Sequence, residues 1–232
     1  MSNEVLLCIS VILLFGGTLL FYYLMGITGL YCWTVLATIA ANIEVLILIR
    51  AFGMEQTLGN VMFASTFLVT DIISEIGGKE KANRAVNIGI MTSMMFILIS
   101  QLWLLYTPAQ GDWAMPSIQA IFSNTPRLML VSFAVYAICQ KFDVWLYHKW
   151  WELTDRKYHD HRRFLWLRNN GSTMISQLLN TVLFTLGAFW GVYDGKTLLS
   201  VLGSSYVIYL VTSLLDTPFV YWARKIKPRS EA

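Results

Sequence analysis

Long apolar runs separated by short polar stretches dominate the pattern along the chain. A helix that crosses a bilayer needs about 20 mostly apolar residues. Seven stretches approach this length: residues 5–25, 30–49, 61–76, 85–106, 128–147, 172–192 and 198–222. The third is the shortest, and only residues 107–126 and 148–170 form long intervening segments. The pattern predicts an all-α integral membrane protein, a bundle of six to seven transmembrane helices.

Composition agrees with a chain whose main partner is the lipid bilayer. The sequence is 56% hydrophobic and 13% charged, and an ordinary soluble domain carries roughly twice that charged share. The net charge of +3 does not suggest a nucleic-acid partner. Cys8, Cys32 and Cys139 are widely spaced, so the sequence predicts neither a disulfide framework nor a metal site, and no cofactor is expected.

The first apolar run is predicted to be a retained helix and not a cleaved signal. Its opening, MSNEV, lacks a basic segment and carries Glu4, and no small-residue cleavage site follows.

Basic residues alternate between the intervening segments and predict the orientation. Three segments are rich in Lys and Arg: the one after the third run, the one after the fifth, and the C-terminal tail. Lys and Arg are enriched in cytoplasmic loops, which predicts a cytoplasmic C-terminus and an N-terminus outside. In this interpretation Arg168 is a loop residue, and Tyr147 belongs to the aromatic belt at the membrane interface.

Two acids stand at the end of the third apolar run. Ionisable residues within spans are costly and usually face a cavity or a partner. Asp71 and Glu75 are four residues apart, on one face of a helix. Two like charges there repel, so one carboxyl holds a proton or both meet a cation or a donor. The alternative is that both lie in the cytoplasmic headgroup zone.

Polar residues recur at i, i+4 and i+7 in each of the last three apolar runs. Such stripes line a polar interior, or they link helices by hydrogen bonds worth about 1 kcal/mol each. Arg127 opens the fifth run. The stripes consist of Tyr136, Gln140 and Asp143, then Thr173, Gln177 and Asn180, then Tyr209, Ser213 and Asp216.

Enzyme motifs are missing from the sequence. It contains no HExxH, GxSxG or Walker pattern and no nucleophile with an obvious base. We therefore expect a protein that is not an enzyme, with no catalytic residues. A membrane-embedded enzyme that uses Asp71 and Glu75 as acid and base is the weaker alternative, and a structural assembly subunit is a third.

Four segments resemble the queuosine precursor transporter family, also known as the vitamin uptake transporters. They are TDIISEIGGKEKANRAV, NTPRLMLVSFAVYAICQKFDVWLY, LWLRNNGSTMISQLLNTVLF and LLDTPFVY, in the family's order, and the likeness covers roughly residues 30–222. It implies an extra N-terminal transmembrane helix over residues 1–29 and a six-helix transporter core over residues 30–232. This core is similar to the substrate-binding subunits of energy-coupling-factor transporters.

The resemblance implies a function in the cell membrane of a prokaryote. The protein would import queuosine precursors for tRNA modification salvage: 7-deazaguanines such as 7-cyano-7-deazaguanine, 7-aminomethyl-7-deazaguanine or queuine. The alternative is a vitamin-type substrate-binding subunit that works with a separate ATP-driven energising module. The possible protein partners are therefore an energising subunit and a second copy of the chain.

Site residues follow from the resemblance by motif. Asn180 departs from the pattern, since family members often have aspartate there. A carboxylate accepts the ring N–H and the exocyclic amine of a guanine-like edge together, and Tyr136 or Tyr209 offers a ring for stacking. Asp71 and Glu75 either accept this edge or form the cytoplasmic gate and coupling site. The motif positions are Asp71, Glu75, Arg127, Gln140, Asp143, Asn170, Ser172, Gln177, Asn180 and Asp216.

Overall fold

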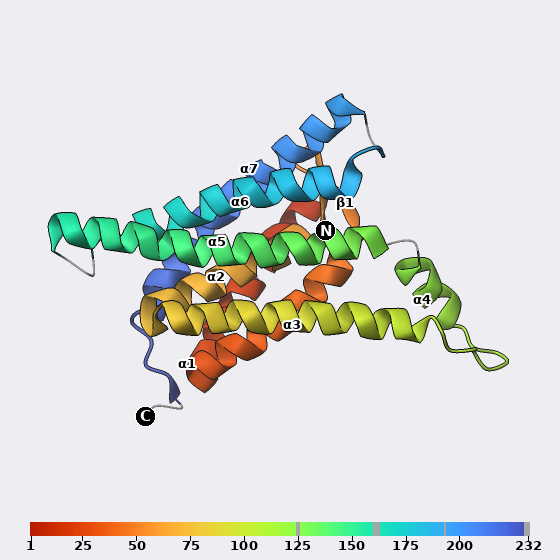
Figure 1. Cartoon of the computed structure of the whole chain (residues 1–232), viewed down its shortest axis with the longest axis horizontal. Coiled ribbons are helices and arrows are strands. Elements are labelled where there is room, and N and C mark those ends of the chain that lie inside the picture. Colours follow the sequence, from red (N-terminus) through yellow and green to blue (C-terminus); the bar gives the residue numbers. More distant parts are fainter. Residues whose placement is uncertain (124–125, 160–162, 193, 230–232) are drawn as a thin grey trace.

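The protein is a bundle of long helices with one small β-hairpin near the end where the N-terminus lies (Figure 1). The computed structural model describes residues 1–123, 126–159, 163–192 and 194–229, and these ranges contain seven helices and two strands. Five of the helices are long and apolar enough to cross a membrane. They are α1 (Asn3–Glu44), α3 (Lys79–Trp103), α5 (Pro126–Tyr158), α6 (Leu165–Phe189) and α7 (Gly195–Ala223). This confirms the predicted helical membrane fold.

Helix α1 is two antiparallel halves joined at a kink. A straight helix of its 42 residues would measure roughly 60 Å, twice the hydrocarbon thickness of a bilayer. At Gly26 the backbone leaves the helical region (φ 61°, ψ −145°). The chain then folds back, since the rings of Phe21 and Trp33 lie 5.2 Å apart and a methyl group on Gly17 would lie 2.5 Å from the Trp33 ring. The two halves correspond to the first and second predicted spans.

The second predicted span is too long, because a β-hairpin replaces its end. Helix α1 stops at Glu44, and β1 (Leu48–Ala51) pairs antiparallel with β2 (Met54–Thr57). Phe52 and Gly53 form the turn with φ of 51° and 74°, the positive values that two-residue hairpins require. Hydropathy alone does not distinguish a short apolar strand from a helix end, so the expectation of an all-α fold was wrong for residues 48–57.

Helix α2 (Gly59–Gly77) lies inside the bundle. Its 19 residues measure about 28 Å, close to the hydrocarbon thickness. Residues 59–74 are buried except at position 63, because α1, α3, α5 and α7 surround the helix. The shielding explains how a membrane helix tolerates Thr66, Thr70, Asp71 and Glu75 without exposing them to lipid.

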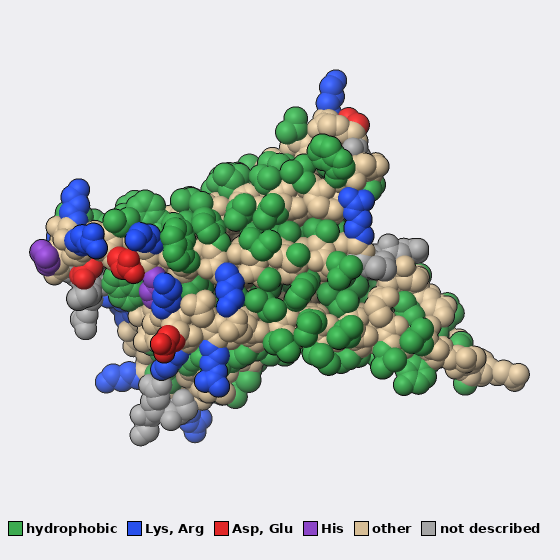
Figure 2. Space-filling model, viewed as in Figure 1, with side chains coloured by type: hydrophobic (Ala, Val, Ile, Leu, Met, Phe, Trp, Pro, Cys, Tyr) green, Lys and Arg blue, Asp and Glu red, His purple; other side chains and the backbone are tan. Residues whose placement is uncertain are grey.

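Two predicted loops are partly helical. Helix α5 continues eleven residues beyond position 147, to Tyr158, and α6 begins at Leu165, seven residues before position 172. Helix α4 (Met115–Phe122) lies within the loop predicted over residues 107–126. Figure 2 shows most Lys and Arg side chains of this face at one end of the bundle, where α5 ends and the C-terminus lies, while hydrophobic side chains cover the middle.

Candidate functional site

Glu75 is held by donors from three other parts of the bundle. Arg168 of α6 donates to its carboxylate at 2.7 and 2.8 Å, and the Tyr147 hydroxyl of α5 donates at 2.8 Å. Arg224, just after α7, lies 3.3 Å from the same carboxylate. The side chains of Glu75 and Arg168 are 4% and 0% exposed. Glu75 therefore ties α2 to α5, α6 and the end of α7, at the basic end of the bundle.

Asp71, one turn deeper, has very different surroundings. Its Oδ2 accepts a hydrogen bond from the Thr173 hydroxyl at 2.9 Å, whereas its Oδ1 has no partner among the described residues. Asp143 of α5 is fully buried, and no hydrogen bond of good geometry reaches its carboxylate oxygens within the same ranges, although the side chains of Asp71, Ser172 and Ser176 are close enough to interact with them. Both Asp143 and Asp216 are near enough to interact electrostatically with Asp71. Three buried acids thus converge from α2, α5 and α7.

Polar side chains of α6 surround these acids. Asn169 donates from Nδ2 to Asp216 at 2.7 Å, and Ser172 donates to the carbonyl of Asn169. Asn170 donates to Thr217 at 2.7 Å, so it links α6 to α7. The buried Gln177 retains an Oε1 atom without a partner in the part of the chain that the structure describes.

Two residues of the polar stripe on α5, Gln140 and Tyr136, form contacts with neighbouring helices. Gln140 donates to Thr66 at 2.7 Å and accepts from Thr70 at 3.2 Å, so it links α5 to α2. The Tyr136 hydroxyl packs against Gly89 of α3, where a side-chain methyl would lie 1.9 Å from it. For these two residues the structure favours interhelical packing over contact with a ligand.

Arg127 lies apart from the acids. Its guanidinium donates to the carbonyls of Gly187 and Trp190 at 3.0 and 2.9 Å. Carbonyls at the end of a helix lack partners within the helix, so Arg127 caps the C-terminal end of α6. The structure does not bring it into the polar interior.

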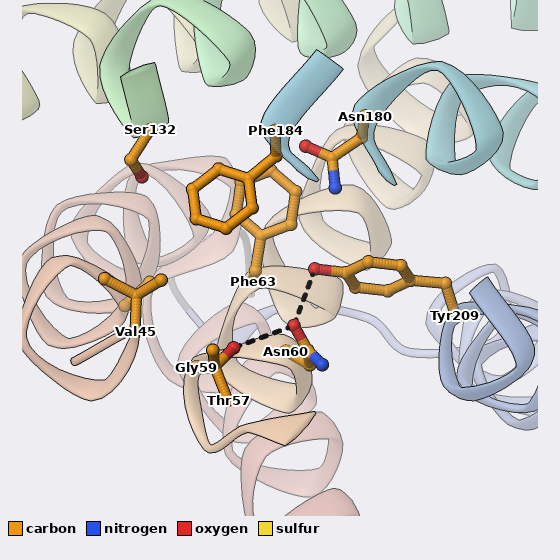
Figure 3. Close-up of a pocket in the computed structure, with 10 residues that line it drawn as sticks. Val45, Thr57, Gly59, Asn60, Phe63, Ser132, Asn180, Phe184 and Tyr209 are labelled. Carbon is orange, nitrogen blue, oxygen red and sulfur yellow. Dashed lines mark hydrogen bonds between the residues drawn. The ribbon is translucent and has the colours of Figure 1, made fainter. Parts of the chain in front are cut away.

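A cavity opens at the end of the bundle opposite the Glu75 network. One chamber of about 40 Å³ adjoins another of about 120 Å³, and both are lined by Asn60, Asn180, Phe184 and Tyr209. Figure 3 shows the amide of Asn180 pointing toward the Tyr209 hydroxyl, and Phe63 and Phe184 line the same chamber. That hydroxyl donates to Asn60 Oδ1 at 3.0 Å. Asn180, a predicted site residue, thus lines the cavity.

Sequence reasoning missed Arg168 and Tyr147. Arg168 was assigned to a cytoplasmic loop, but α6 starts before it and buries it, with the Trp151 ring 4.3 Å from its guanidinium carbon. Tyr147 was assigned to the aromatic belt, yet it is fully buried. The signal for Arg168 was its position four residues before Ser172, which extends the polar face of α6 by one turn.

Comparison with known proteins shows the family. Residues 57–223 match the family described as "Putative vitamin uptake transporter". The chain is 37% identical over 213 residues to a Bacillus subtilis (strain 168) protein named "Probable queuosine precursor transporter", covering 92% of this chain and 91% of that protein. No solved structure matches the chain.

The matched region spans α2 to the end of α7, and it includes the three buried acids and the Glu75 network. The matches agree with the resemblance found in the four sequence segments. The chain therefore belongs to the vitamin uptake transporter family, whose members include queuosine precursor transporters.

Proposed function

We propose that the protein imports queuosine precursors, 7-deazaguanines such as 7-cyano-7-deazaguanine, 7-aminomethyl-7-deazaguanine or queuine, for tRNA modification salvage. The name of its B. subtilis relative supports this substrate class. The protein is a multi-pass protein of the cell membrane, and its family is one of transporters and not of enzymes.

The observation that carries the proposal is the open acceptor capacity of Asp71 and Asp143. An ionised carboxylate only accepts hydrogen bonds, and the three unpartnered oxygens of these two acids are buried. A guanine-like edge presents a ring N–H and an exocyclic amine side by side, which one carboxylate accepts as a bidentate pair. Asp143, neither of whose oxygens accepts a hydrogen bond of good geometry in the described residues, is the better acceptor of this edge, and Asp71 with one such oxygen supports it.

Glu75 is better suited to the cytoplasmic gate than to substrate recognition. Its carboxylate already accepts from Arg168 and Tyr147, so it is not available to a substrate while these bonds hold. Because the bonds join α2, α5 and α6 at one end of the bundle, we assign Glu75 to the closure of that end. Asp71 and Glu75, adjacent on one helix face, thus divide recognition and gating between them.

The charge distribution supports one orientation of the protein in the membrane. Lys and Arg gather at the end that holds the Glu75 network (Figure 2), and this favours a cytoplasmic location for that end. The cavity then faces outward. A substrate would pass from the cavity to Asp71 and Asp143 and leave when the Glu75 network opens. A C-terminal tag that an antibody reaches only in permeabilised cells would agree with this orientation.

Uptake and binding together test the function. Cells that cannot make the precursors receive one in the medium, and the modified nucleoside in their tRNA is measured by mass spectrometry. Wild-type protein should restore the nucleoside, and Asp143→Asn should not. Asp112→Asn is the matched control, because Asp112 is exposed and caps α4 through a bond to the Met115 N–H that asparagine can also form.

The purified protein supplies the second measurement. Selective thermal stabilisation by one deazaguanine, lost in Asp143→Asn, would support the substrate class and its site. If folded wild-type protein neither restores the nucleoside nor binds any precursor, the proposal is wrong. Uptake by the protein alone in liposomes would argue against a separate energising subunit. Three expectations stay predictions: the energising subunit, the second copy of the chain, and the division into an extra N-terminal helix over residues 1–29 and a transporter core over residues 30–232.

A further inference from the structure

The outward cavity contains amide groups that the fold leaves unpaired. Gln56 of β2 is 3% exposed, and among the described residues neither its Nε2 nor its Oε1 has a hydrogen-bond partner. Asn60, 6% exposed, lacks a partner for Nδ2 by the same criterion. Unpaired buried polar groups destabilise a fold and are rare in native proteins. Two of them at one cavity indicate groups kept for a ligand.

The rest of the lining indicates the chemistry of that ligand. Phe184 and Tyr209 border both chambers, and Phe63 and Phe189 border one each. Glu55 is the one charged side chain among the described lining residues, and it is exposed. Aromatic rings with uncharged polar groups suit a flat, neutral, hydrogen-bonding heterocycle, and they do not suit a phosphate or a strongly charged ligand.

We propose that this cavity is a first binding site, which captures the neutral heterocycle before it reaches Asp71 and Asp143. A carboxamide presents an N–H donor and a C=O acceptor side by side. The lactam edge of a guanine-like ring presents the complementary C=O and N–H. Gln56 pairs with this edge, Asn60 donates from Nδ2, and the ring stacks against the aromatic wall. The inference rests on the proposed function and assigns it a second site.

The two sites are separate and select for different features. Asn60 and Asp71 are eleven residues apart on α2, about 16 Å along the helix axis. The cavity requires an adjacent donor and acceptor, so it admits hypoxanthine, which has the lactam edge without the exocyclic amine. The carboxylates accept two donors, so they require the amine as well. Hypoxanthine should therefore compete for capture without being carried through.

Gln56→Leu tests the capture site directly. Leucine fills a similar space and removes an amide that has no partner in the fold, so the ligand-free protein should keep or gain thermal stability. With two hydrogen bonds to the ligand lost, Kd and the KM of uptake should rise about tenfold, with the maximal rate unchanged. Gln119→Leu is the matched control, because Gln119 is exposed on α4, outside the cavity.

The outcomes separate the two claims. Wild-type uptake that hypoxanthine inhibits, together with a raised KM in Gln56→Leu, supports the capture site. Normal wild-type uptake with unchanged KM and Kd in Gln56→Leu overturns the capture site and leaves the proposed function standing. A wild-type protein that takes up no precursor overturns the proposed function, and the capture site with it.

Discussion

Replacing Glu75 with glutamine should destabilise the protein strongly. The substitution keeps the shape of the side chain and removes its charge. Arg168 is 0% exposed, so its guanidinium would be left buried without its ion-pair partner. Removing one member of a buried ion pair typically costs about 3–5 kcal/mol. A change of 1 kcal/mol shifts Tm by about 2–4 °C in a protein of 150–250 residues, so Tm should fall by about 6–20 °C.

The assay is thermal unfolding of the purified protein in detergent, followed by tryptophan fluorescence. Glu152→Gln is the control. Glu152 pairs with Lys149 at 3.6 Å, but the two side chains are 62% and 50% exposed, and exposed ion pairs contribute about 0–1 kcal/mol. The control should leave Tm within about 4 °C of the wild-type value.

A second substitution separates the ion pair from general packing. Arg168→Met added to Glu75→Gln removes the buried positive charge, and neutral replacement of a whole buried pair is often tolerated. The double variant should therefore recover part of the lost stability. A loss in Glu75→Gln no larger than that in Glu152→Gln, or a double variant as unstable as the sum of its parts, would refute the reasoning.

Three further predictions test other parts of the structure. Gly29→Ala places a methyl group 2.1 Å from the backbone oxygen of Phe21 and should prevent stable folding of α1. The control is Gly16→Ala, whose methyl group meets nothing within 4 Å, so Tm should be unchanged or slightly raised. Expression yield and Tm are measured for both variants. Asp143→Asn replaces a buried acid that accepts no hydrogen bond of good geometry among the described residues and lies beside Asp71, so it should raise Tm while uptake is lost, and a lower Tm would contradict the open-acceptor interpretation. Tyr147→Phe removes one hydrogen bond to the charged Glu75, so Tm should fall by about 3–12 °C, less than in Glu75→Gln; an equal fall would show that the hydroxyl matters as much as the charge.

Hydropathy located the helices well because each membrane crossing requires a long apolar run. The two halves of α1, α3 and α7 follow predicted runs closely. It failed at the hairpin, because the predicted run continues through Leu48 and Ile49 into β1, and hydropathy does not reveal the turn that Phe52 and Gly53 make with positive φ values. It also ended α5 too early and began α6 too late, since helices that extend beyond the bilayer have no apolar pattern to mark their ends.

Candidate polar residues could be recognised from the sequence, but their roles could not. Side chains at i, i+4 and i+7 share a helix face whatever they contact, so Gln140, Asp143 and Tyr136 looked alike. The structure separates them, because Gln140 is paired with α2, Tyr136 packs on Gly89, and Asp143 keeps both oxygens open. Gln56 gave no signal at all, since its burial depends on how the hairpin folds over α2 and α7.

Sequence information alone is enough to predict a helical membrane protein that resembles one transporter family, with acids in an apolar interior. Composition and local periodicity suffice for that, because the bilayer acts on each span separately. Helix packing was needed to show that Glu75 meets Arg168, that Asp71 lies near Asp143, and that amide side chains line the cavity at the other end of the bundle. These contacts join residues up to about 150 positions apart, and the packing of whole helices brings them together.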